Sequence, residues 1–394
     1  MKKLTVVLFF CLLLSPWHHI SHAQIRCGAE RTELYLPLLK NQRVAICTNP
    51  TGTIGKTHIV DSLNALQLTI VKIFAPEHGF RGDAEAGAVI QSGIDTKTGI
   101  PVVSLYGKNK KPSPKQLEDV DYILFDIQDV GCRFYTYIST LHYIMEAAAE
   151  QGVKVLILDR PNPNGYFVDG PILNMEYQSF VGMHPIPVVH GMTIGEYGMM
   201  INGEKWLANG VECDLQVIPV EGYDHTTRYS LPIPPSPNLQ TDEAIYLYPS
   251  LCLFEGTDIS VGRGTPYPFQ QFGHPDLKVG EDYFTPVPIP KVSENPPQKG
   301  KKCRGINLTQ YAQKELPKGN SFNVEYLLLA YQNFPNKEQF FTNKNFFDKL
   351  AGSATLRWQI INGRTQEEIE QSWQKDLEAF KQIRSKYLLY PDFE

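Results

Sequence analysis

The fold follows from residues 121–159, which contain the segments DYILFDI (121–127), TLHYIMEAAAEQ (140–151) and VKVLILD (153–159). The two outer segments are nearly continuous apolar runs, which are typical of strands buried on both faces. The middle segment repeats apolar residues every three or four positions, which predicts a helix, and Gly152 supplies its C-terminal stop. A strand, a helix and a second strand in this order predict two parallel strands joined by a crossover helix.

Three further strands are predicted upstream, at residues 43–49, 68–74 and 101–106. Strands that alternate with helical segments predict an α/β domain whose parallel sheet is covered by helices on both faces. Ligands of such open sheets bind beyond the carboxyl ends of the strands. No G-x-G-x-x-G motif follows the first strand, so we expect no dinucleotide and assign no other cofactor.

The second half of the chain differs in composition, because residues 232–297 are rich in proline. This predicts loops and short strands, with little helix until the end of the chain. There, Thr365 and Glu368 form a capping box before a helix whose apolar stripe extends to Tyr387. We therefore predict a smaller α+β domain at the C-terminus, with the domain boundary near Ala244.

The first 23 residues have the features of a secretory signal peptide. Two lysines precede an apolar run, and SHA at residues 21–23 fits a cleavage site with small outer residues. The run is too short for an ordinary transmembrane helix, and a short membrane anchor is the alternative. We predict an exported protein, periplasmic or secreted, with domains at 24–244 and 245–394 and no later membrane-spanning segment.

The charge of the chain restricts its partners. Its formal net charge is −5, and loss of the two signal-peptide lysines makes the mature chain −7. An acidic chain without a Lys/Arg run is a poor candidate for nucleic-acid binding. It also repels an anionic polymer unless local cations reverse the field at the site.

Six cysteines follow the predicted signal peptide. Their even number and the predicted export permit disulfides. A chain of this length can also build its core with free thiols, and none of the cysteines lies in a C-x-x-C pair that would indicate a zinc or redox site. The sequence leaves both disulfides and free thiols open.

The segment FAPEHGFRG, residues 74–82, follows the second predicted strand. Pro76 and the two glycines favour a tight loop, which is expected to hold Glu77, His78 and Arg81 above the sheet. A partly desolvated carboxylic acid in such a loop is suited to general acid catalysis. The structural alternative is an ion pair between Glu77 and Arg81.

A second polar group lies in residues 125–137, at the end of the fourth strand. Asp126 and Asp129 supply carboxylates, Arg133 supplies a permanent cation, and Tyr137 offers a ring and a hydroxyl for a sugar. The structural alternative is an N-cap made by Asp129, with buried tyrosines behind it.

Two later loops add candidate binding residues. In DRPNPNG, which begins at Asp159, prolines and a glycine stiffen a loop that carries Arg160 and Asn162. Further along the chain, Asn238, Glu255 and Arg263 lie among prolines and glycines, as expected of a cleft wall supplied by the C-terminal domain. A structural loop is the alternative for the second of these segments.

Two carboxylates with nearby arginines and tyrosines fit glycoside hydrolysis. One acid protonates the leaving oxygen, and the second carboxylate activates water, attacks the sugar or orients a 2-acetamido group of the substrate. The sequence nominates Glu77 as the acid and Asp129 as the second carboxylate, with Asp126 as the other candidate.

These motifs resemble the exo-β-N-acetylmuramidases of the NamZ-like family, formerly a family of unknown function. The resemblance covers almost the whole mature chain. It runs through FAPEHGFRG, DIQDVGCRFYTYISTL, DRPNPNG, PIPVVHGMTIGE, PPSPN and LFEGTDISVGRGT. It implies a Rossmann-like domain, a smaller C-terminal domain and a site in the cleft between them. It also implies release of N-acetylmuramic acid from the non-reducing ends of peptidoglycan-derived saccharides in cell-wall turnover, with Glu77 as the catalytic residue.

Arginine can bind the lactyl carboxylate of N-acetylmuramic acid through two parallel hydrogen bonds, which gives Arg81, Arg133 and Arg263 a role in an acidic protein. Two other readings compete with this one. The first is a metal-dependent hydrolase that uses carboxylates and His78 as ligands, although we assign no metal. The second is a peptidoglycan-binding protein without catalysis. No G-x-S-x-G motif supports a serine hydrolase.

Overall fold

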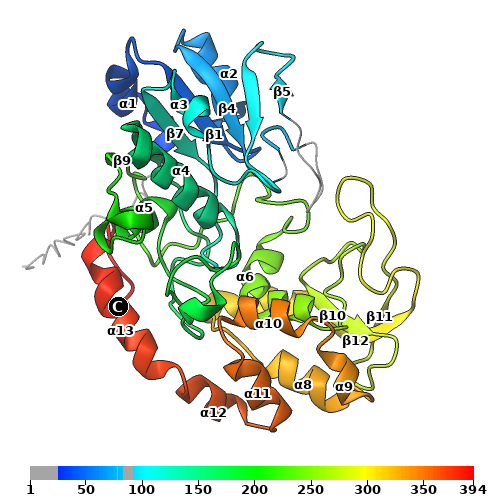
Figure 1. Ribbon diagram of the computed structural model, residues 1–394. Helices are drawn as coiled ribbons and strands as arrows, with labels where there is room; N and C mark the ends of the chain where they lie inside the picture. The colour runs from blue at the N-terminus through cyan, green and yellow to red at the C-terminus, as the bar shows by residue number, and fades with distance from the viewer. Residues whose placement is uncertain (1–24, 78, 83–91) are drawn as a thin grey trace, which may run out of the picture.

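The computed structural model of the protein describes residues 25–77, 79–82 and 92–394 (Figure 1). The predicted signal peptide lies outside these residues and stays a prediction. Within the described part of the chain, every helix falls short of the length and apolarity that crossing a membrane requires.

The N-terminal part is built on a seven-stranded sheet with the order β5-β6-β4-β1-β7-β8-β9. Neighbouring strands run parallel from β6 to β9, and β5 is antiparallel to β6. The predicted parallel sheet is therefore confirmed, and each of the five predicted strands is present with ends shifted by at most two residues. The strands are β1 (Val44–Thr48), β4 (Ile70–Ala75), β5 (Gly93–Ile94), β6 (Pro101–Ser104), β7 (Tyr122–Asp126), β8 (Lys154–Leu158) and β9 (Leu215–Ile218). A two-stranded ribbon, β2 (Thr53–Ile54) and β3 (Thr57–His58), follows β1.

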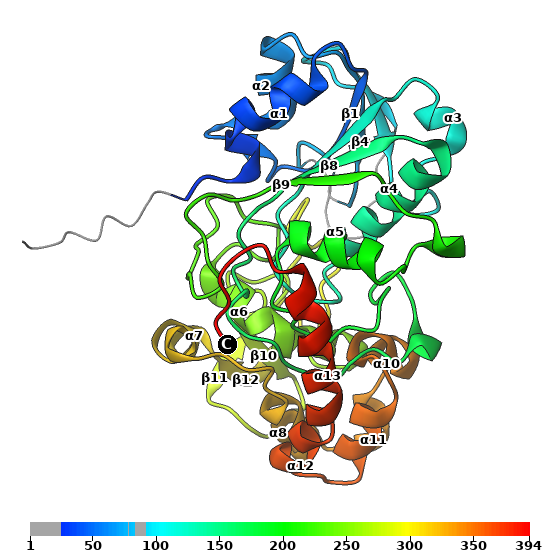
Figure 2. The same ribbon diagram turned by 90° about the vertical axis from the view of Figure 1, so that its left-hand side faces the viewer.

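Both faces of the sheet are buried, because successive side chains of each strand point to opposite sides. In β1, Val44 and Ile46 join one apolar cluster, whereas Ala45 and Cys47 join the other. Figure 2 shows the helices in two layers on either side of the sheet. The first layer is α1 (Thr32–Leu39) and α2 (Ile59–Ala65), and the second is α3 (Pro114–Leu117), α4 (Tyr137–Gln151) and α5 (Ile194–Gly203).

The C-terminal part combines an antiparallel three-stranded sheet, of order β10-β12-β11, with many short helices. The expectation of little helix before the end of the chain was wrong. Helices α7 to α11 have between four and nine residues, so they are too short to show a clear period, and packing stabilises them rather than local propensity. The elements are α6 (Asp242–Leu251), β10 (Gln271–His274), β11 (Asp282–Phe284), β12 (Cys303–Asn307), α7 (Thr309–Lys314), α8 (Glu325–Asn333), α9 (Lys337–Phe340), α10 (Lys344–Ala351) and α11 (Thr355–Ile361). The predicted boundary at Ala244 falls inside α6 and stays a prediction.

The predicted final helix is present in two pieces, α12 (Gln366–Gln371) and α13 (Gln374–Arg384). The capping box of Thr365 and Glu368 is confirmed. Beyond it, α13 packs along the N-terminal part (Figure 2), where the buried guanidinium of Arg384 donates hydrogen bonds to the carbonyl oxygen of Gly191 at 2.7 and 3.1 Å. The C-terminal helix therefore ties the two halves of the chain together.

The six cysteines are all buried free thiols. Burial raises the pKa of the Cys47 and Cys213 thiols, which keeps them protonated and unreactive. The disulfides that the even count left open do not form, and the hydrophobic core supplies the stability.

The carboxyl end of β8 is tied to the C-terminus through Asp159. Its Oδ2 accepts hydrogen bonds from the hydroxyls of Tyr390 at 2.5 Å and Thr193 at 2.7 Å. Complete burial nevertheless raises the pKa of the Asp159 carboxyl to about 6. The folded protein therefore retains this proton at a pH where the unfolded chain has lost it.

This pKa predicts how stability depends on pH. The stabilising contribution of Asp159 is complete below about pH 4 and is lost as the pH rises through about 6, by about 3 kcal/mol in total. We expect the free energy of unfolding of the wild type to fall over this window by more than that of Asp159→Asn, measured by urea denaturation at each pH. Equal slopes for the two proteins would contradict the assignment.

Candidate active site

The site lies where three parallel strands of the sheet end. Glu77 follows β4 by two residues, Tyr106 follows β6 by two residues, and Thr136 is the N-cap of α4 after β7. Because the carboxyl ends of parallel strands meet at one edge, these three side chains converge there. This is the edge at which open α/β sheets bind ligands.

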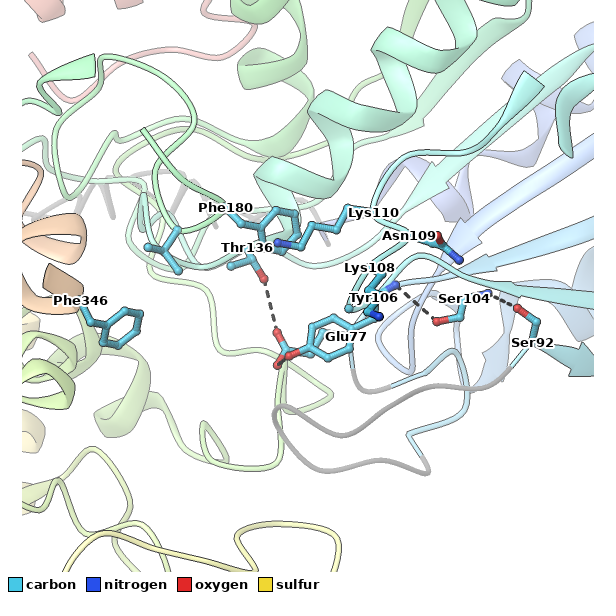
Figure 3. Close-up of a pocket in the computed structure, with 12 residues that line it drawn as sticks. Glu77, Ser92, Ser104, Tyr106, Lys108, Asn109, Lys110, Thr136, Phe180 and Phe346 are labelled. Atoms are coloured by element: carbon cyan, nitrogen blue, oxygen red, sulfur yellow. Dashed lines mark hydrogen bonds between the residues drawn. The ribbon is translucent and has the colours of Figure 1, made fainter. Parts of the chain in front are cut away.

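Glu77 is held from both sides by hydroxyl groups. Tyr106 Oη donates to Glu77 Oε1 at 3.0 Å, and Thr136 Oγ1 donates to Oε2 at 3.5 Å (Figure 3). The Thr136 hydroxyl makes no capping hydrogen bond to α4, so it is available to the carboxylate. Burial raises the pKa of Tyr106, so this phenol stays a donor at neutral pH. The carboxylate of Glu77 thus has a defined orientation at the edge of the sheet.

A cavity of about 760 Å³ opens beside Glu77 and is called cavity 1 here. Its volume is typical of small-molecule sites. Its walls combine the polar side chains near Glu77 with an apolar side made by Phe180, Val181 and Phe346, the last from α10 of the C-terminal part. The other lining residues are Ser92, Ser104, Tyr106, Gly107, Lys108, Asn109, Lys110 and Thr136.

A smaller cavity of about 160 Å³, cavity 2, adjoins the first. Glu77, Thr136 and Val181 line both, so Glu77 lies at their junction. Cavity 2 is also lined by four other residues that the sequence nominated, from both halves of the chain. They are Tyr137, Asn238, Glu255 and Arg263.

The C-terminal part contributes a carboxylate and an amide to cavity 2. Glu255 lies in the short helix η4 (Cys252–Gly256), and its Oε1 accepts a hydrogen bond from Arg263 Nε at 2.6 Å. Asn238 donates from Nδ2 to the carbonyl oxygen of Val292 at 3.0 Å, while its buried Oδ1 has no partner among the described residues. A buried acceptor of this kind suits a substrate N–H or O–H donor.

Asp129, which was predicted to be the second catalytic carboxylate, lies away from the cavities beside Glu77. Its side chain is buried and lines neither of the two cavities. Oδ2 accepts a hydrogen bond from the backbone N–H of Gly131 at 2.7 Å and lies 3.6 Å from His190 Nε2. Asp129 thus shapes the loop after β7, and the N-cap of α4 is Thr136 instead.

Asp126 and Arg160 were expected to bind substrate, but the structure pairs them in the interior. Arg160 donates from Nε and from its terminal guanidinium to the two carboxylate oxygens of Asp126, at 2.6 and 3.0 Å. The side chains are 0% and 5% exposed, and neither lines a cavity described above. The pair connects the ends of β7 and β8 beneath the site.

Arg81 also lies apart from both cavities. Its guanidinium donates to Asp95 at 2.8 and 2.9 Å and to Asp61 at 3.0 Å, which anchors the loop after Glu77 to α2. His78 lies outside the described residues, so its predicted role stays a prediction. Among the described residues, no group of three or more His, Cys, Asp and Glu side chains has an arrangement that could hold a metal.

Two further nominated residues support loops instead of lining the cavities. The fully buried Arg133 donates to the carbonyl oxygens of Pro171, Ile186 and Leu350, so it joins α10 to the N-terminal part. Asn162 donates to the carbonyl oxygen of Met192 at 2.8 Å. It packs so closely on Gly131 (φ 74°) that a Cβ there would lie 2.5 Å from the amide. Both side chains are thus engaged with the protein itself, and their role in substrate binding stays a prediction.

Sequence reasoning missed the residues that orient Glu77 and line cavity 1. Tyr106 is the last residue of a predicted strand and the lysines of GKNKK, residues 107–111, directly follow it, so the rule that found Glu77 applies to them as well. The net negative charge of the chain as a whole conceals this short Lys run. Phe180 and Phe346 carry no such signal, because only tertiary packing brings them to the site.

Comparison with known proteins relates the chain to a family. The model described as "Exo-beta-N-acetylmuramidase NamZ, N-terminal" matches residues 44–243, and its C-terminal counterpart matches residues 246–390. The peptidoglycan beta-N-acetylmuramidase NamZ of Bacillus subtilis (strain 168) is 40% identical over 375 residues. The match covers 90% of this chain and 89% of that protein.

Two crystal structures of DUF1343 family proteins from Bacteroides fragilis NCTC 9343 have the same fold. The first has a TM-score of 0.87 and 49% sequence identity, covering 94% of this chain and all of that one. The second has a TM-score of 0.75 and 30% identity, covering 93% and 99% respectively. The likeness therefore extends through both halves of the chain.

Proposed function

The chain belongs to the exo-beta-N-acetylmuramidase NamZ family, and on this premise we propose that it releases N-acetylmuramic acid from the non-reducing ends of peptidoglycan fragments, with Glu77 as the proton donor. The chain is a glycosidase, and the relative from Bacillus subtilis is named for action on peptidoglycan. Export stays a prediction from residues 1–23.

The observation that carries the proposal is the position of Glu77. Its carboxyl group lies at the junction of two cavities, with a hydroxyl donor on each oxygen. A group that protonates a leaving oxygen must reach the bond between two sugars. A junction between two cavities meets this requirement, because the sugars on the two sides of the bond need separate room.

In the proposed reaction, Glu77 transfers a proton to the glycosidic oxygen as the bond to the anomeric carbon breaks. We assign the second carboxylate to Glu255 in place of Asp129, because Glu255 lines cavity 2 together with Glu77. Its ion pair with Arg263 fixes its direction. From there it either accepts a proton from the water molecule that attacks the anomeric carbon, or orients the substrate's own 2-acetamido group for that attack.

The test uses the wild-type protein and a tetrasaccharide that alternates muramic acid and glucosamine units, with muramic acid at the non-reducing end. Mass spectrometry is expected to detect free N-acetylmuramic acid first, with and without a chelator. Internal cleavage would contradict the exo mode, and loss of activity with the chelator would favour a metal-dependent hydrolase. Binding without any release would favour the non-catalytic alternative.

A further inference from the structure

Cavity 1 contains positive charge that the reaction itself does not use. Lys108 and Lys110 both line it, and neither forms an ion pair with a carboxylate of the described chain. The neighbouring Lys111 differs, because it pairs with Glu146 at 2.7 Å and Glu150 at 2.8 Å outside the cavity. Among the described residues, Lys108 and Lys110 therefore have no carboxylate partner, and they are positioned to meet a ligand in cavity 1.

The arginines once expected to bind an anion are engaged elsewhere. Arg81 pairs with two aspartates, Arg133 donates to three backbone carbonyls, and Arg263 pairs with Glu255. In a chain of net charge −5, an anionic sugar needs a local positive field to enter. Lys108 and Lys110 supply that field beside Glu77.

The wall next to these lysines is apolar. Lys110 Nζ lies 4.0 Å from the ring centre of Phe180. Figure 3 shows these two side chains next to each other, and Val181 and Phe346 also line the cavity. The lactyl ether of muramic acid carries one carboxylate and one methyl group on the same carbon. A cation beside an apolar surface is complementary to both groups at once.

We propose that Lys108 and Lys110 bind the lactyl carboxylate of the terminal N-acetylmuramic acid and thereby select it over N-acetylglucosamine. This inference rests on the proposed function and adds the residues that recognise the sugar. The lysines act on substrate binding, whereas Glu77 acts on the chemical step.

The test compares Lys108→Gln, Lys110→Gln and the double variant with Lys115→Gln, a matched control at an exposed position of α3. The substrates are a chromogenic N-acetylmuraminide and its neutral lactyl amide. For the acid, each single variant is expected to raise KM about tenfold and the double variant more, with little change in kcat. For the amide, KM is expected to stay the same in all four variants and the wild type. Arginine at both positions is expected to restore binding of the acid.

The outcomes separate this inference from the proposed function. A wild type that cleaves neither substrate would contradict the function itself. An active wild type with an unchanged KM in the folded double variant would overturn only the role of the lysines. An effect confined to longer fragments, which carry a second lactyl carboxylate, would also overturn the assignment to the terminal sugar.

Discussion

Glu77→Gln is expected to lower kcat on a disaccharide of muramic acid and glucosamine by a factor of about 10² to 10⁴, the usual contribution of a general acid. Glutamine keeps the size of the side chain and can accept the hydrogen bonds from Tyr106 and Thr136 at one oxygen only. It has no acidic proton to give to the leaving oxygen. KM is expected to change much less, because the cavities keep their shape. Release of N-acetylmuramic acid, measured by mass spectrometry, gives both constants.

Three variants serve as comparisons for this result. Glu118→Gln makes the same change at an exposed position outside both cavities and is expected to leave kcat unchanged. Glu255→Gln is expected to reduce kcat strongly, whereas Asp129→Asn is expected to act mainly on stability, because its buried oxygen holds Gly131. Near-normal turnover by correctly folded Glu77→Gln would remove the central assignment.

The sequence contained enough information for the sheet but not for the C-terminal half. The central strands β1, β7 and β8 are nearly continuous apolar runs because both faces are covered, and such runs are visible without tertiary structure, whereas the edge strands β5 and β9 were not predicted. The helices between residues 309 and 361 depend on contacts such as those of the buried Leu327, Phe347 and Leu356. A local repeat of apolar residues in the sequence does not reveal tertiary contacts of this kind.

The site residues also divide into those that the local sequence reveals and those that depend on tertiary packing. The rule that strand ends carry ligands found Glu77, and the loop motifs of the second half found Glu255 and Arg263. The rule does not say which polar residues face a cavity and which turn inward. Asp126 and Arg160 lie at strand ends in the sequence, yet both side chains are buried and hydrogen-bond to each other and to the backbone.

Arg160→Met is expected to lower the free energy of unfolding by about 3–5 kcal/mol. The variant leaves the carboxylate of Asp126 buried without its cation. Burial already raises the pKa of Asp126, and the guanidinium of Arg160 opposes this rise, so the variant is expected to take up a proton there. The donation from Arg160 to the carbonyl oxygen of Thr53 is lost as well. Urea denaturation of both proteins at neutral pH measures the difference.

The matched control is Arg43→Met, which breaks the exposed pair of Arg43 and Asp121 at the opposite end of β7, where β1 and β7 begin. We expect a much smaller loss there, because solvent screens exposed charges. The double variant Asp126→Leu/Arg160→Met is expected to recover much of the stability, since no unpaired charge remains. Equal losses for Arg160→Met and Arg43→Met would show that burial of the pair does not determine its contribution to stability.

The folded double variant also tests whether Asp126 and Arg160 support the site structurally or bind the substrate directly. A normal KM fits a pair beneath the site, whereas a raised KM would return Asp126 and Arg160 to the substrate contacts that the sequence predicted.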